Sequence, residues 1–111
     1  MEEFCMSKVT VLTADTFETF VKQPFALVDF WAPWCGPCRA LLPVLDKIAE
    51  EHDVHIGKVS VEEETMQHWV EFYKIRSIPT LLFFKDGNLM ETHIGSIPEK
   101  DLLSKIQSYN G

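Results

Sequence analysis

The chain has 111 residues, of which 46% are hydrophobic and 24% are charged, and its formal net charge is −7. This is the length of one domain that can bury roughly two-thirds of its unfolded surface. The acidic balance argues against nucleic acid as a partner, and no stretch approaches the ~20 apolar residues of a membrane-spanning helix. We therefore expect one α/β domain over residues 1–111, with no nucleic-acid and no membrane partner.

The order of the expected elements indicates the fold class. They are strands over 9–12, 26–32 and 54–61, helices over 14–21, 39–50 and 63–73, a hairpin formed by 81–84 and 89–94, and a last helix from about residue 99. Thr13 and Asp15 are candidate caps for the first helix. Strands that alternate with helices, followed by a hairpin and a helix, predict a central mixed sheet with helices on both faces.

The amino terminus and the cysteines indicate the cellular compartment in which the protein works. Met1–Lys8 contains two acidic residues and lacks the basic start and apolar run of a secretory signal. Three cysteines cannot form a fully paired framework, and a close pair suits a catalytic or metal role better than a structural disulfide. We therefore expect a reducing, cytoplasmic location, with Cys5 as an incidental free thiol.

Cys35 and Cys38 stand two residues apart between the strand over 26–32 and the helix over 39–50. Two thiols at this spacing can close a small disulfide ring or hold one reactive thiolate. Cys35 falls at the amino end of the helix, where unpaired N–H groups and the helix dipole favour a thiolate, while Cys38 lies on the apolar stripe. We predict that Cys35 attacks a substrate disulfide and that Cys38 resolves the mixed disulfide. Gly36 and Pro37 shape the ring between the sulfurs and are expected to tune its redox poise.

Several segments resemble the thioredoxin family. Residues 31–39 (WAPWCGPCR) resemble its active-site motif, 75–80 its cis-proline segment, and 83–87 with Gly95 its closing hairpin, while Asp29 and Lys58 stand where the family has a buried acid and a lysine. These matches occur in the family's order and cover nearly the whole chain. The chain is therefore identified as a member of the thioredoxin family, with the fold of that family.

The resemblance also implies an activity. It implies a protein-disulfide reductase with no bound cofactor, whose redox centre is the disulfide Cys35–Cys38 and whose substrates are disulfide-containing proteins. A flavoprotein thioredoxin reductase drawing on NADPH would keep it reduced, and we expect a monomer. The resemblance further implies a cis bond before Pro79 and an apolar substrate groove. The expected groove residues are Trp34, Val61, Ile78, Pro79, Gly95 and Ser96.

Asp29 is the one charged residue of its strand. A buried carboxylate is costly, so its pKa should be raised, which suits an acceptor for the Cys38 thiol proton. Lys58 on the adjacent strand would support it electrostatically. The alternative is a buried acid satisfied by hydrogen bonds alone.

Two departures from the family pattern leave another function open. The acidic run Glu62–Glu64 replaces an aspartate and a short polar loop, and its charges are expected to form a solvated face. Lys74 stands where many relatives have glycine, so a local backbone angle is expected to differ. The alternative to a reductase is an interaction module dedicated to one partner, with the acidic run as the surface to test. A metal site would need a second cysteine or histidine pair, which the spacing does not supply.

Overall fold

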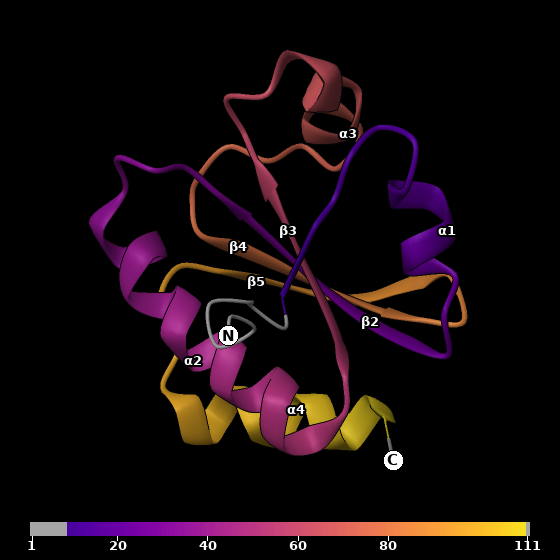
Figure 1. The fold of residues 1–111 in the computed structure, drawn as a ribbon, viewed down its shortest axis with the longest axis vertical. Coiled ribbons are helices and arrows are strands. Elements are labelled where there is room, and N and C mark those ends of the chain that lie inside the picture. Colours follow the sequence, from indigo (N-terminus) through magenta and orange to yellow (C-terminus); the bar gives the residue numbers. More distant parts are fainter. Residues whose placement is uncertain (1–8, 111) are drawn as a thin grey trace, which may run out of the picture.

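The computed structural model describes residues 9–110, which form a mixed sheet with the strand order β1-β3-β2-β4-β5 (Figure 1). The strands are β1 (Thr10–Val11), β2 (Phe25–Trp31), β3 (His55–Ser60), β4 (Thr80–Lys85) and β5 (Asn88–Ile94). The helices are α1 (Phe17–Val21), α2 (Gly36–His52), the 3-10 helix η2 (Glu64–Met66), α3 (Gln67–Phe72) and α4 (Glu99–Asn110). Strands β1, β3 and β2 are parallel, whereas β4 runs antiparallel to β2 and β5 antiparallel to β4. The expected mixed sheet is confirmed.

The central strand β2 carries a core on each of its faces. Phe25 and Leu27 belong to a buried cluster with residues of α2 and α4, two helices that lie side by side (Figure 1). Val28 and Phe30 belong to a second cluster, which includes Phe17 of α1. All of these side chains are nearly or fully buried, and each contributes about 1.5–3 kcal/mol of hydrophobic stabilisation. The near-continuous apolar run of this strand therefore reflects a strand covered on both sides.

Three of the expected helices differ from those in the structure. Helix α1 starts at Phe17 because the preceding segment is a turn, in which the Thr13 N–H donates to Thr16 Oγ1 at 2.9 Å. Thr16 is the N-cap residue, so both candidate caps were wrong. Helix α2 starts earlier than expected, at Gly36, with Cys35 as its N-cap. The predicted helix over 63–73 is divided into η2 and the short α3.

Two backbone positions place special demands on their side chains. Lys74 has φ of 55°, the left-handed conformation that costs a residue with a Cβ about 1–2 kcal/mol. Gly57 in β3 lies under α1, and a Cβ built there would approach the Leu12 Cδ1 atom to 2.7 Å. A larger residue at position 57 would therefore force the buried Leu12 to move.

The described residues contain no helix that is both long and apolar enough to cross a membrane. Cys5 and the rest of Met1–Lys8 lie outside the described residues, so the expectations for them stay predictions.

Candidate functional site

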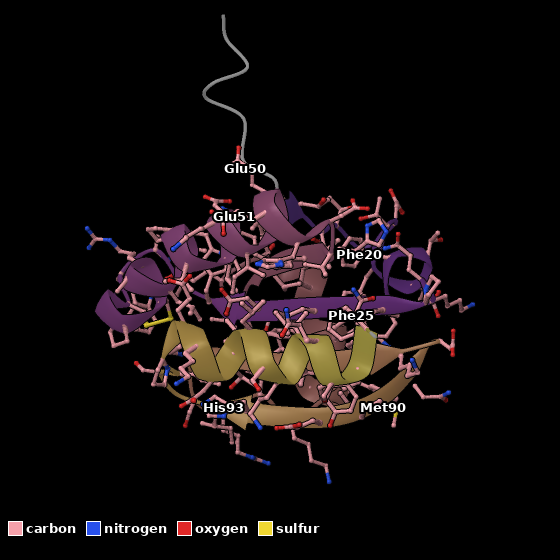
Figure 2. The ribbon with its side chains drawn as sticks, turned by 90° about the horizontal axis from the view of Figure 1, so that it is seen from below. Phe20, Phe25, Glu50, Glu51, Met90 and His93 are labelled. Atoms are coloured by element: carbon pink, nitrogen blue, oxygen red, sulfur yellow. A yellow bond between two sulfur atoms is a disulfide. The ribbon has the colours of Figure 1, made fainter. Side chains whose placement is uncertain are left out.

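The two cysteines lie where β2 leads into α2. Cys35 has the extended backbone of an N-cap residue, and its Sγ accepts a hydrogen bond from the Cys38 N–H at 3.2 Å. The two sulfurs form a disulfide, which Figure 2 draws as a yellow bond. Cys35 is 6% exposed and Cys38 is 0% exposed. The expected asymmetry, an outer sulfur at the helix start and an inner one on the buried stripe, is confirmed.

The dipeptide between the cysteines forms the first turn of α2. Pro37 lies in this turn, where helix N–H groups lack intrahelical partners, so its missing donor costs no helix hydrogen bond. A Cβ built on Gly36 would meet no atom within 4 Å. The surface beside Cys35 is therefore open to an approaching chain.

Asp29 lies in the buried interior, in the strand β2 that leads toward the cysteine pair. Side chains two apart on a strand share a face, so Asp29 points to the same side as Leu27, the side that α2 covers. It is fully buried, and neither carboxylate oxygen has a hydrogen-bond partner among the described residues. Burial raises the pKa of Asp29 from 3.8 to about 7, against a smaller lowering by the positive charge of Lys58. The expectation of a raised pKa is confirmed, and hydrogen bonds do not satisfy this acid.

Lys58 is the register partner of Asp29 across β2 and β3, so the two side chains lie on the same face of the sheet. Its Nζ atom lies 5.1 Å from the centre of the Trp31 ring, within the range of a cation–π contact. The ammonium group of Lys58 therefore lies over the indole of Trp31, which follows Asp29 by two residues in β2. This geometry holds the positive charge near Asp29 without an ion pair.

Backbone from the loop before β4 comes close to the sulfurs. The Ile78–Pro79 peptide bond is cis, and the Ile78 carbonyl oxygen lies 4.0 Å from Cys35 Sγ. The Gly95 N–H donates to the Pro79 carbonyl oxygen at 2.8 Å, which joins the end of β5 to this loop. Val61 and Ile78 also pack against the cysteine cluster. The structure thus brings together Val61, Ile78, Pro79 and Gly95; Ser96 is exposed and follows Gly95 directly.

Trp34 precedes Cys35 and is 66% exposed, as expected. Its indole N–H donates to the carboxylate of Glu62 in the loop after β3. The sequence pattern did not predict this contact, because three consecutive acidic residues are typical of a solvated face. Only the position of Glu62 after a predicted parallel strand, at the same edge of the sheet as Cys35, could have indicated it.

A disulfide at the start of a helix, next to a cis-proline loop and after a strand that carries a buried acid, defines a dithiol–disulfide exchange protein. The family model described as Thioredoxin matches residues 8–108. The chain is 40% identical over 106 residues to "Thioredoxin 1" of Synechococcus elongatus, covering 94% of this chain and 99% of that protein. It is 41% identical over 97 residues to "Thioredoxin M-type, chloroplastic" of Chlamydomonas reinhardtii, covering 86% of this chain and 69% of that protein. A mutant thioredoxin from Halobacterium salinarum NRC-1 superposes with a TM-score of 0.86 at 32% identity, covering 96% of each chain. The chain belongs to the thioredoxin family.

Family membership and the cysteine pair together establish the activity. The protein is a thiol–disulfide oxidoreductase that acts as a protein-disulfide reductase. Its redox centre is the intrinsic pair Cys35–Cys38, and thioredoxins carry no further cofactor. Within residues 9–110 no group of three or more potential metal ligands comes together. The alternative of an interaction module with secondary redox turnover is not favoured.

Proposed function

We propose that the protein reduces substrate disulfides in two exchange steps. In the reduced protein, the Cys35 thiolate attacks one sulfur of the substrate disulfide, which forms a mixed disulfide and releases the other sulfur as a thiolate. Cys38 then attacks Cys35 Sγ, so that the mixed disulfide breaks and the second substrate thiolate leaves. The substrate gains two electrons and the protein ends as the Cys35–Cys38 disulfide. The observation that carries this assignment is the N-cap position of Cys35, whose sulfur accepts the Cys38 N–H.

We further propose that Asp29 accepts the proton of the Cys38 thiol as Cys38 attacks. A base should have a pKa near the working pH, and the pKa of Asp29 is raised to about 7. Its two unpartnered oxygens and its position on the α2 side of the sheet support this role. Lys58 would stabilise the carboxylate that must be present before the proton arrives.

The substrate segment is proposed to lie in an apolar groove next to Cys35. The groove residues are Trp34, Val61, Ile78, Pro79, Gly95 and Ser96. The contact of Ile78 with the cysteine cluster and the hydrogen bond from Gly95 to Pro79 support this placement. An extended substrate would pair with backbone at Ile78, as in strand addition to a sheet edge.

A flavoprotein thioredoxin reductase drawing on NADPH is the proposed source of the two electrons and protons that regenerate the dithiol. We also propose that the chain works as a monomeric single domain over residues 1–111 in the cytoplasm. NADPH oxidation by such a reductase that requires both this protein and insulin would support this reductase as the partner. Because one relative is named chloroplastic, a ferredoxin-dependent reductase is assayed in parallel as the alternative source of electrons. Recycling by that enzyme alone would replace the proposed partner.

Insulin reduction with dithiothreitol as electron source tests the cysteine roles. The intact protein should reduce insulin rapidly, and Cys35→Ser should abolish turnover. In a separate reaction without dithiothreitol, which would cleave a mixed disulfide, reduced Cys38→Ser should stop after one exchange and accumulate a mixed disulfide with insulin, visible as a band of increased mass on a non-reducing gel. Accumulation of that adduct in Cys35→Ser instead would reverse the two assignments.

A further inference from the structure

The exposed ring of Trp34 requires a restraint if it is to form one wall of the groove. A surface tryptophan exchanges rotamers freely unless a contact holds it, and two-thirds of Trp34 is in solvent. The contact that holds this ring is the hydrogen bond from its indole N–H to the carboxylate of Glu62, 28 residues away in the sequence. The orientation of Trp34 therefore depends on where the loop after β3 holds Glu62.

That loop is fixed by the side chain of Gln67, the first residue of α3. The Gln67 amide nitrogen donates to the Val61 carbonyl oxygen at 2.8 Å and to the Glu63 carbonyl oxygen at 2.9 Å. These carbonyls belong to the residues immediately before and after Glu62. One side-chain amide thus uses both of its N–H donors to fasten the backbone on either side of the residue that holds Trp34.

The backbone of the loop makes further contacts: the Val61 N–H donates to the Trp31 carbonyl oxygen at 2.9 Å, and the Met66 N–H donates to the Glu63 carbonyl oxygen at 3.1 Å. The Glu62 N–H donates to Ser60 Oγ at 3.3 Å and the Glu63 N–H to the Ser60 carbonyl at 3.2 Å, and both contacts lie at the β3 end of the loop. Gln67 instead ties the loop to α3. Glu62 and Glu63 are exposed, so neither is held in place by packing.

We propose that Gln67 is a positioning residue for substrate binding: it fixes the 61–63 loop, so that Glu62 holds the Trp34 indole beside Cys35. This inference rests on the proposed groove. Gln67 touches neither sulfur, and the Cys35–Cys38 hydrogen bond does not involve the loop. Its loss should therefore weaken the binding of a protein substrate and leave the exchange chemistry unchanged.

The test compares Gln67→Met, which keeps the side-chain length but removes both donors, with Gln107→Met, the same change at an exposed position of α4. Each variant is assayed with insulin and with dithiobis-nitrobenzoate, a small disulfide that does not need the groove. We expect Gln67→Met to raise KM for insulin about fivefold, the equivalent of one exposed hydrogen bond, with kcat and the rate with the small disulfide unchanged. The control should match the unmodified protein.

A double-mutant cycle with Glu62→Ala separates positioning from simple stability. Because Gln67 acts through Glu62, the KM effects of the two changes should not add, and Gln67→Met in the Glu62→Ala background should cause no further increase. The indole N–H signal of Trp34 in a nitrogen-15 NMR spectrum should move in both single variants. Additive effects, equal loss of rate with both disulfides, or an unchanged indole signal would overturn the proposal. Failure of the unmodified protein to reduce insulin would instead overturn the groove itself.

Discussion

Replacing Asp29 by asparagine should change how the stability of the protein depends on pH. Asp29 ionises near 3.8 in the unfolded chain and near 7 in the folded protein, because its carboxylate is buried. Between these values the unfolded state releases a proton that the folded state keeps, so the free energy of unfolding falls as pH rises. One pH unit corresponds to ~1.4 kcal/mol, so the loss is complete above pH 7 and amounts to about 4 kcal/mol.

Urea denaturation of the oxidised protein and of Asp29→Asn, from about pH 4 to pH 8, measures this loss. The free energy of unfolding of the unmodified protein should fall by about 4 kcal/mol more than that of the variant over this range. The asparagine amide is buried too, but its cost does not depend on pH and cancels from the comparison of slopes. Parallel pH profiles for the two proteins would refute the reasoning. The reductase activity of the unmodified protein should in turn rise through pH 7, and this step should be absent from the variant.

The other predictions concern one charge and two backbone positions. Lys58→Met removes the charge that lowers the pKa of Asp29, so that pKa should rise further; carbon-13 NMR titration of the carboxyl measures it, and a lower value would contradict the assignment. Gly57→Ala should destabilise the protein by about 1–3 kcal/mol through overpacking. In Gly36→Ala the added Cβ meets no atom, so thermal unfolding of this variant should show no such loss of stability. Lys74→Gly relieves the left-handed backbone and should stabilise by about 1 kcal/mol in urea; a loss of stability would show that the lysine side chain contributes more than the strain costs.

Periodicity and motif order predicted much of the fold and the centre of the site. The apolar run of β2 and the single acid within it indicated a strand covered on both faces, and Asp29 is fully buried with a raised pKa. The spacing of Cys35 and Cys38 allowed a disulfide, and the place of Cys38 on the apolar stripe of the helix indicated the unequal exposure of the two sulfurs. These features are local in sequence, so one segment contains the information that specifies them.

Turn hydrogen bonds, helix ends and contacts between distant segments could not be predicted in the same way. The start of α1 was wrong because the Thr16 hydroxyl accepts a hydrogen bond from a backbone N–H in the preceding turn, a choice that several nearby polar residues could have made. The hydrogen bond from Trp34 to Glu62 depends on how two loops meet at one edge of the sheet. At Lys74, the positive φ belongs to the left-handed end of α3, where the Ile75 N–H donates to the Val70 carbonyl oxygen at 2.9 Å, a helix end that usually takes glycine.

The two edge strands of the sheet affect whether copies of the protein pair with one another. At one edge, β1 is two residues long, and at the other, the β4–β5 ladder contains an irregularity between Phe83 and Phe84. Short edge strands and bulges discourage edge-to-edge pairing. A protein that is proposed to bind extended chains beside Cys35 can therefore do so while these features discourage pairing between its own copies.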